Sequence, residues 1–336
     1  MRSLPKPSRA FDLLFHFFLG ERMKKQALVI AAVSTVAGLA STASAATYSE
    51  DFNVNSTANW TVNDPGLSDV TANFFYDYST IGVPAAPNGT GTRGLKMTAN
   101  NTGAVFSGFS VSPNGQNFTG NYTVSFDIWQ NYVGPLGIGG SGSTQLSTYG
   151  IGTSGTTAFW PGAATKESVA FGTTLDGGSA NDVRAYSTAA PTGYASGNAV
   201  FAPATTNNNS NAYYAPFTSQ SAPAAQVGLY PGQTGSTDLG ETSFAWRRVV
   251  ITVNGNLATW AIDGLNMATI DLSTVTLGGG NILFGHSDTN AGVSADANDS
   301  LLNVTLIDNI QVIPEPTGFA MLGLVGAGLI ARRRRA

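Results

Sequence analysis

The feature that most constrains the fold of this chain is the alternation of apolar and polar residues in its clearest segments. From Tyr122 to Ile128, large apolar side chains occupy every second position, and Thr, Ser and Asp fill the positions between them. A period of two is typical of a strand with one face against a core. Phe244–Val253 is a β-branched and aromatic run, Asn254-Gly255 favours a two-residue hairpin turn, and Leu257–Ile262 supplies the returning strand.

The remaining segments extend this pattern. Asp263-Gly264 marks a second turn, and Leu301–Ile313 supplies a long final strand. No stretch between the terminal segments has a helical period with caps, so we predict an all-β domain, a two-sheet antiparallel β-sandwich over residues 46–313. Residues 134–240 are rich in Gly, Ser, Thr and Asn but hold eleven aromatic residues. We interpret them as an insertion of short strands and long ordered loops, because disordered segments are poor in aromatic residues.

The amino-terminal 45 residues have the pattern of an export signal. Met23 is followed by two lysines, residues 27–39 are apolar, and Ala43 and Ala45 occupy the small-residue positions of a cleavage site. We therefore predict a hydrophobic signal helix that signal peptidase removes, with Met23 as the start of translation. An alternative is a long basic segment on the same signal, which leaves the prediction of export unchanged.

The carboxyl-terminal end has three parts in a fixed order: Pro314-Glu315-Pro316, the uncharged residues 317–331, and a basic cluster of Arg332, Arg333, Arg334 and Arg335. This order resembles the PEP-CTERM sorting signal. The resemblance implies a transient membrane segment, recognition by an exosortase, and delivery to the cell surface or extracellular matrix. A plain tail anchor is the alternative, although a helix of fifteen residues is only about 22 Å long.

Charge and cysteine content exclude several classes of function. Between Ala46 and Ile313 there are six Lys and Arg residues against seventeen Asp and Glu residues. A body this acidic repels phosphate backbones, so nucleic acid is not an expected partner. The chain has no cysteine, which excludes disulfides and thiolate metal sites. An excess of carboxylates suits a divalent cation such as Ca²⁺.

Five short motifs along the chain suggest a more specific fold. They are Glu50-Asp51-Phe52, Gly91-Thr92-Arg93-Gly94-Leu95-Lys96-Met97, the hairpin from Trp246 to Trp260, Gly280-Asn281-Ile282-Leu283-Phe284-Gly285, and Leu306-Ile307-Asp308-Asn309-Ile310. In this order they resemble the concanavalin A-like, or laminin-G-like, jelly rolls of exported bacterial proteins. The resemblance implies two packed antiparallel sheets, and in some members calcium or sugar binding at a rim or on a concave face.

Carboxylates at the two ends of the sandwich are candidate metal ligands. Asp308 falls by alternation on the same face of the last strand as five apolar residues, Leu302, Val304, Leu306, Ile310 and Val312. Glu50 lies between Tyr48 and Phe52 in the same way. Because first and last strands are often neighbours in closed sandwiches, Glu50, Asp51 and Asp308 are predicted to hold a structural Ca²⁺. An alternative that the sequence supports equally well is that these carboxylates lie at the rim of the sandwich and accept hydrogen bonds from backbone N–H groups.

A second cluster of oxygen ligands precedes the last strand. Asp288, Asp296 and Asp299, with Asn298, occupy one loop. Their spacing is not that of an EF-hand, so solvated turn residues are the favoured interpretation and a second metal site is the alternative.

One aromatic residue is a candidate ligand contact. Trp129 shares the polar face of its strand with Asp127 and Asn131. An aromatic ring edged by hydrogen-bonding groups is what a sugar ring stacks against. The favoured alternative is that the Gly-rich segment covers Trp129 as a second core layer.

Enzymatic functions receive little support. The body has three glutamates, Glu50, Glu167 and Glu241, and none lies in the paired pattern of sandwich glycosidases. His286 is the one histidine of the body, and no Gly-x-Ser-x-Gly motif is present. We therefore expect a non-enzymatic exported surface or matrix protein that contributes to biofilm or exopolysaccharide architecture and binds glycan weakly. The competing hypothesis is a carbohydrate-active enzyme, a glycoside hydrolase or lyase, on the same fold.

Overall fold

The computed structural model describes residues 47–66, 69–103, 106–135, 143–162, 166–176, 182–208, 211–290, 292–293 and 296–315. The predicted cleavage residues Ala43 and Ala45 lie outside these ranges, as do Pro316 and the basic cluster Arg332–Arg335. Within the described ranges, no helix has both the length and the apolar character needed to cross a membrane.

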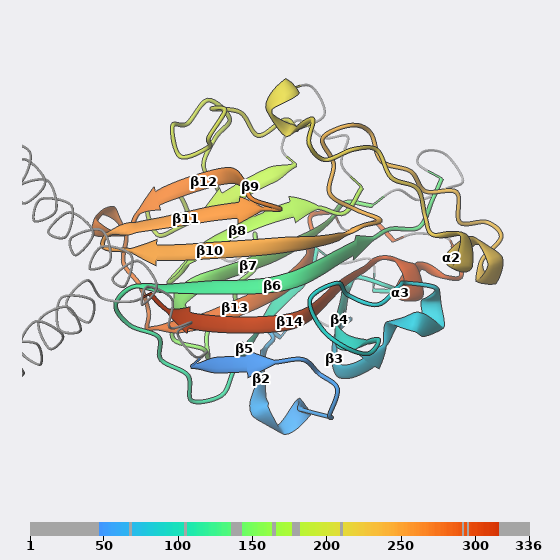
Figure 1. Cartoon of the computed structure of the whole chain (residues 1–336), viewed down its shortest axis with the longest axis horizontal. Coiled ribbons are helices and arrows are strands. Elements are labelled where there is room, and N and C mark those ends of the chain that lie inside the picture. The colour runs from blue at the N-terminus through green and yellow to red at the C-terminus, as the bar shows by residue number, and fades with distance from the viewer. Residues whose placement is uncertain are drawn as a thin grey trace, which may run out of the picture. The chain divides into compact units, whose positions relative to one another are not determined.

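Two antiparallel sheets form the described body (Figure 1). The larger, sheet A, has eight described strands in the order β12 (Leu265–Asp271), β11 (Leu257–Ile262), β10 (Trp246–Asn254), β6 (Tyr122–Asn131), β14 (Val304–Pro314), β4 (Arg93–Ala99) and β3 (Val70–Asp77), with β1 (Tyr48–Glu50) also paired to β14. Sheet B has six described strands in the order β2 (Trp60–Asn63), β5 (Gly108–Pro113), β13 (Asn281–Asp288), β7 (Gln145–Thr153), β8 (Val169–Thr174) and β9 (Val183–Tyr186). The predicted all-β, two-sheet antiparallel sandwich is confirmed.

Helices contribute little to the described body. They are η1 (Thr57–Asn59), η2 (Tyr78–Ile81), η3 (Ala212–Tyr214), α2 (Ala224–Leu229), η4 (Leu272–Thr274) and α3 (Asp299–Leu302). Each is a turn or two long and lies in a connection between strands, so none forms a layer of its own (Figure 1).

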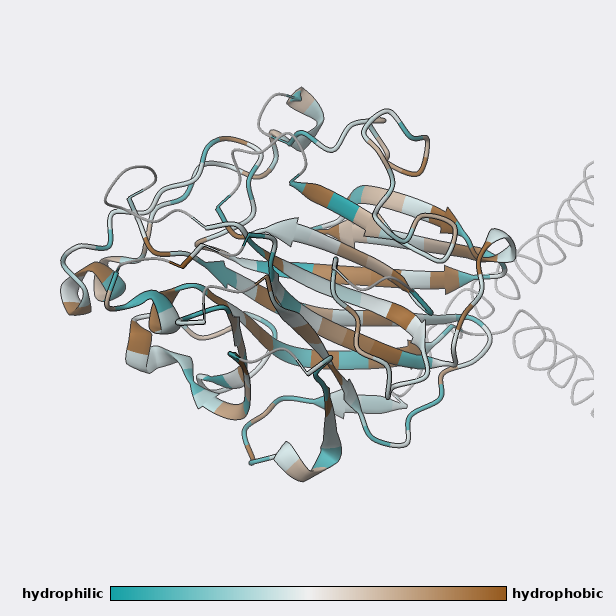
Figure 2. Cartoon of the chain, turned by 180° about the vertical axis from the view of Figure 1, so that it is seen from behind, coloured by the Kyte–Doolittle hydropathy of each residue, from teal (hydrophilic) through white to brown (hydrophobic). Residues whose placement is uncertain are grey.

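The main core lies between the facing surfaces of the two sheets. Phe126 of sheet A is fully buried, and its ring centre lies 5.0 Å from that of Tyr149 and 4.9 Å from that of Phe284, both in sheet B. Figure 2 shows apolar residues recurring along the same strands as polar ones. The alternation from Tyr122 to Ile128 thus places its apolar members between the sheets, as the period of two predicts.

The hairpins follow the sequence signals closely. β10 and β11 pair as predicted, but Asn254 pairs with Leu257, so the turn consists of Gly255 and Asn256 rather than of Asn254 and Gly255. Between β11 and β12 the turn is Asp263-Gly264, as predicted, with φ of 50° and 81°. Positive φ at both positions is the requirement of the hairpin turn that matches the twist of the strands.

The segment 134–240 is more than an insertion. It supplies β7, β8 and β9, which form half of sheet B, and β7 lies between β13 and β8. The described part of the segment thus contains the expected short strands, but these strands belong to the sandwich itself. The Gly- and Ser-rich composition of the segment did not indicate this role. Small residues are frequent here because neighbouring strands lie close together: a Cβ at Gly150 would lie 2.2 Å from the Val169 carbonyl oxygen.

The first and last strands are neighbours, as predicted, because β1 pairs with β14 from Tyr48↔Val312 to Glu50↔Ile310. The prediction that Asp308 shares one strand face with both Val304 and Ile310 is wrong. A β-bulge interrupts the pairing with β6 between Asp308 and Gln311, and Asn309 has φ of 53°. The extra residue reverses the alternation, so Ile310 faces the main core while Asp308 stays on the outer face of sheet A.

Strand β14 also runs slightly past the predicted boundary of the sandwich. Pro314 pairs with Tyr122, and the Glu315 N–H donates to the Asn121 carbonyl oxygen at 2.9 Å. The Thr123 hydroxyl donates to Glu315 Oε1 at 2.5 Å. The first two residues of the Pro-Glu-Pro motif are therefore part of the folded body.

His286 lies within β13 and is fully buried. Its Nδ1 is 2.8 Å from Thr305 Oγ1, and its Nε2 is 2.6 Å from Gln145 Oε1. Burial lowers the pKa of His286 to about 3, so the imidazole is neutral at ordinary pH. A neutral, enclosed ring bonded to a hydroxyl and an amide is a structural element of the core.

We predict that Phe126→Ala lowers the free energy of unfolding by about 3–5 kcal/mol, because it leaves a cavity between two aromatic rings of the opposite sheet. Urea denaturation of both proteins measures the change. Val62→Ala is the control, since Val62 is 45% exposed on β2 and its truncation should cost less than about 0.5 kcal/mol. Equal losses in the two variants would contradict the placement of Phe126 at the centre of the core.

Candidate functional site

A buried carboxylate, Asp127 of β6, organises the outer face of sheet A. Its side chain is fully buried. Asp127 Oδ1 accepts from Asn88 Nδ2 at 2.7 Å and from Arg248 Nη1 at 3.2 Å. Asp127 Oδ2 accepts from the Asn88 N–H at 3.2 Å and from Asn309 Nδ2 at 2.8 Å. Four donors thus satisfy a charge that would be costly to bury alone.

Arg248 of β10 ties these groups together. Besides its ion pair with Asp127, its Nη1 lies 3.2 Å from the Asn309 carbonyl oxygen, and its Nη2 donates to Ser125 Oγ at 2.7 Å. Ser125 and Asp127 share the outer face of β6 because they are two residues apart. One guanidinium therefore links β10, β6 and the bulge of β14.

A second carboxylate, Asp308, lies directly opposite Asp127 in the register of β14 and β6. Its Oδ2 accepts from the Tyr78 hydroxyl at 3.0 Å, and its Oδ1 accepts from the Asn309 N–H at 2.7 Å. Burial, with a smaller contribution from the negative charges of Asp127 and Asp51, raises the pKa of Asp308 to about 7.

Residues 82–92, called here the covering loop, lie over these carboxylates. Near its start, the Pro84 carbonyl oxygen accepts from Trp246 Nε1 at 2.7 Å, and the Ala86 N–H donates to the Tyr78 hydroxyl at 3.2 Å. Asn88 then contacts Asp127 through both its backbone and its side chain. The covering loop joins η2 to β4, and in Figure 1 it passes in front of sheet A beside β14.

Next to the covering loop is a polar pocket of about 390 Å³. Its walls come from three segments, residues 49–51 at the end of β1, 88–90 in the covering loop, and 309–311 at the bulge. The lining therefore combines carboxylate, amide and hydroxyl groups with backbone. We refer to it as the bulge pocket.

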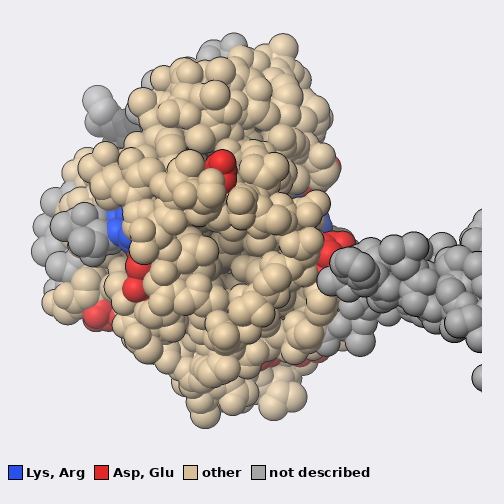
Figure 3. All heavy atoms as spheres, turned by 90° about the vertical axis from the view of Figure 1, so that its left-hand side faces the viewer, with Lys and Arg blue, Asp and Glu red and all other residues tan. Residues whose placement is uncertain are grey.

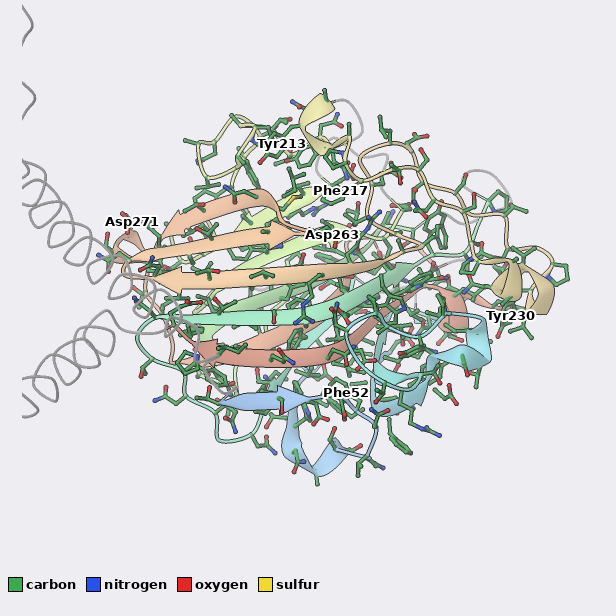
Figure 4. All side chains as sticks on the ribbon, in the orientation of Figure 1. Phe52, Tyr213, Phe217, Tyr230, Asp263 and Asp271 are labelled. Carbon is green, nitrogen blue, oxygen red and sulfur yellow. The ribbon has the colours of Figure 1, made fainter. Side chains whose placement is uncertain are left out.

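Two details of the backbone shape the bulge pocket. At Gly89 a Cβ would lie 1.8 Å from Asn309 Oδ1, so only glycine allows the Asn309 side chain to reach Asp127 past the covering loop. Phe52, which follows the pocket residue Asp51, has φ of 52° and is fully buried (Figure 4). Positive φ is strained for a bulky residue, and such strain is frequent beside functional sites.

The three carboxylates predicted to bind Ca²⁺ are only partly brought together. Glu50 and Asp51 line the bulge pocket, whereas the Asp308 carboxylate is bonded to Tyr78 and to the Asn309 N–H. Among the residues that the structure describes, no three acidic or histidine side chains are grouped so that they could hold a metal ion. Calcium binding by Glu50, Asp51 and Asp308 therefore stays a prediction.

The second acidic cluster is also dispersed. Asp288 is buried and accepts from Asn100 Nδ2 at 2.7 Å and from the Asn290 N–H at 2.9 Å. Asp296 accepts from the Asn298 N–H at 2.8 Å, and Asp299 is bonded to the side chain of Asn303. Asp288 thus joins distant segments, and because Asp288 and Asp299 are buried, these two residues are not the solvated turn residues that the sequence favoured.

The candidate aromatic contact lies inside the protein. Trp129 is 2% exposed, its Nε1 donates to Asn131 Oδ1 at 3.1 Å, and its ring centre lies 5.9 Å from that of Trp246. Asp127 and Asn131 are buried as well. The structure thus places Trp129 in a second core layer, so no open stacking surface exists at this position.

Several residues of the site were not predicted. Arg248, Asn88, Gly89, Asn309 and Gln311 are separated from each other along the chain by up to 223 positions. Asn88-Gly89 reads as a turn in the sequence, which gives no indication that the turn folds onto a distant buried carboxylate. An unpaired Asp on a strand face was the one available signal, because a buried charge requires partners.

Comparisons with known proteins show only distant similarity. No protein-family model matches the sequence, and no curated protein is similar to it. A Bacillus subtilis protein of unknown function with a galectin-like fold is 10% identical, with a TM-score of 0.40 over 80% of this chain and 96% of that one. The carbohydrate recognition domain of Emp47p is 9% identical, with a TM-score of 0.41 over 82% and 100%. A Bacillus licheniformis β-glucanase is 10% identical, with a TM-score of 0.38 over 81% and 99%.

We predict that Asp308→Asn changes the pH dependence of stability. The folded pKa of about 7 lies above the usual value of 3.8, so the folded state holds an extra proton between these values. The contribution of Asp308 to the free energy of unfolding is therefore lost as pH rises from about 4 to 7. The variant should gain stability relative to the wild type by up to about 1.4 kcal/mol per pH unit in this window.

Urea denaturation of both proteins at several pH values measures this difference. His286 titrates in the opposite sense, since its lowered pKa makes acid destabilising, but it is present in both proteins and cancels. A difference that does not vary with pH would contradict the burial of Asp308.

Proposed function

We propose that this protein is an exported, non-enzymatic β-sandwich of the cell surface or extracellular matrix, which binds polysaccharide at the bulge pocket. The observation that carries the proposal is the pocket itself, because its concave wall combines side chains from three separate segments. The resemblance of the sequence to concanavalin A-like jelly rolls agrees with this function.

The chemistry of the lining supports a glycan as ligand. Ser49 and Thr90 offer hydroxyl groups that donate and accept, and Gln311 offers an amide with both capacities. In the described ranges none of these three side chains forms a hydrogen bond within the protein, so each is available to the hydroxyl groups of a sugar. A pocket open to solvent with exchangeable polar contacts favours weak, reversible binding.

The buried carboxylate pair supports a non-enzymatic role. A general acid must lie within hydrogen-bond reach of the atom it protonates. Asp127 and Asp308 are 0% and 1% exposed, and the covering loop is bonded to Asp127. Both carboxylates act instead as anchors for this loop and for the bulge.

One observation favours the alternative, a carbohydrate-active enzyme. Asp127 and Asp308 lie opposite each other, Asp127 is paired with Arg248, and Asp308 has a pKa near 7. Two carboxyl groups in such different environments can divide the roles of base and acid. This function would require the covering loop to move away, and hydrolysis or cleavage of a bound polysaccharide by the wild type would be its signature.

The terminal segments support export. The signal pattern that ends at Ala43 and Ala45 is typical of a substrate of signal peptidase. The PEP-CTERM-like segment 314–336 resembles the signal that an exosortase recognises. The membrane is then a transient partner, and extracellular polysaccharide is the final one.

We predict that full-length protein binds at least one polysaccharide class on a glycan array and that Gln311→Ala weakens this binding by about fivefold, the value of one hydrogen bond. Gln116→Ala is the matched control, because Gln116 lies outside the pocket, in the loop between β5 and β6. Titration calorimetry with the bound glycan measures the change. Equal affinities for the two variants would remove the bulge pocket as the binding site.

We also predict that deletion of residues 316–336 changes the final location of the protein but leaves its body folded. The deletion starts after Glu315 because this residue is bonded to Asn121 and Thr123. Cell fractionation and circular dichroism of the truncated protein test the two parts of the prediction. Unchanged location would contradict the sorting function of the segment.

A further inference from the structure

The bulge pocket has acidic side chains that no described basic residue pairs with. Glu50 and Asp51 are the acidic residues in its wall, and its described lining contains no Lys, Arg or His. Neither carboxylate forms an ion pair within the described ranges. Arg248, which contacts the neighbouring Asn309, is already paired with the buried Asp127. Among the described residues, no basic side chain is paired with Glu50 or Asp51, so a cationic ligand can supply the compensating charge.

Both carboxylates are held in place with one oxygen still available. Glu50 Oε1 accepts from the Phe52 N–H at 2.9 Å, and Asp51 Oδ1 accepts from the Asn53 N–H at 3.1 Å. No described group donates to Glu50 Oε2 or to Asp51 Oδ2. These backbone bonds fix the direction of each side chain, so the two remaining oxygens are oriented acceptors rather than freely moving surface charges.

The body as a whole also has little positive charge. The body contains six Lys and Arg residues against seventeen Asp and Glu residues. On the face drawn in Figure 3, charged side chains are few and separated by uncharged surface. The field at the pocket thus favours cations and repels anions, most strongly at low salt.

We propose that the bulge pocket selects a polysaccharide whose sugars carry free amino groups, that is, a deacetylated hexosamine polymer. The inference rests on the proposed function and names the ligand class of the same site. A protonated amine offers one positive charge and three donors to the two available carboxylate oxygens. The hydroxyl groups of Ser49 and Thr90 and the amide of Gln311 then contact sugar hydroxyls. A uronic acid polymer would place its carboxylate against Glu50 and Asp51 and is excluded.

The test compares three tetramers that differ in charge: glucosamine, N-acetylglucosamine and galacturonic acid. Calorimetric titration of full-length protein at about pH 5.5, where the sugar amine is protonated, gives each affinity. We expect the glucosamine tetramer to bind about tenfold tighter than the N-acetylated one, since each exposed ion pair gives a factor of up to about five. Galacturonate should not bind, and added salt should reduce the preference.

Isosteric variants separate charge from shape. Glu50→Gln and Asp51→Asn keep the oxygen that accepts the Phe52 or Asn53 N–H, so the fold should persist, and melting curves verify this. Each variant should lower the preference for glucosamine about threefold to fivefold, and the double variant should abolish it. Asp271→Asn is the matched control, because Asp271 is exposed, lies away from the pocket (Figure 4), and Asn also caps a helical turn.

The outcomes distinguish this inference from the function on which it rests. If the glucosamine and N-acetylglucosamine tetramers bind with equal affinity, and Glu50→Gln changes neither affinity, the selection of amines is overturned. The proposed glycan-binding function would still stand. Binding of none of the tetramers, and of no polysaccharide on the array, would overturn both. Binding of Ca²⁺ alone that is lost in Glu50→Gln, without binding of glucosamine, would identify the pocket as a cation site and also overturn the inference.

Discussion

The burial of the Asp127 carboxylate is the constraint on which the outer face of sheet A depends. A carboxylate without solvent is stable only if ion pairs and hydrogen bonds replace its hydration. Here the replacement comes from three directions: Arg248 from β10, Asn88 from the covering loop, and Asn309 from β14. One charge therefore determines how three separate segments meet.

The geometry of the bulge pocket follows from this arrangement. Asn309 reaches Asp127 because the bulge turns its side chain outward, and it passes the covering loop because residue 89 is glycine. The same bulge returns Ile310 to the main core, where it pairs with Glu50 of β1. The end of β1 is thereby held beside the bulge, and its carboxylates become part of the pocket wall.

Much of the fold could be predicted from the sequence because its signals are local. Alternation over Tyr122–Ile128, the turn at Asp263-Gly264 and the pairing of the first and last strands are all present as expected. The site could be predicted only in part. Glu50 and Asp51 were identified as candidate metal ligands, but the bulge at Asn309 reverses the strand faces that alternation assigned, and a single inserted residue has no distinct sequence signal. The cover over Trp129 depends on distant residues such as Tyr78 and Phe244, which no local pattern connects to it.

Amide hydrogen exchange of the full-length protein, with and without glucosamine tetramer, tests the account most directly. It reports at once where the ligand binds and whether the three segments that line the bulge pocket act as one site. The account predicts slower exchange confined to residues 49–53, 86–91 and 309–311, with the β11–β12 hairpin unchanged. Slower exchange elsewhere in the sandwich, or no change in any of these three segments, would contradict it.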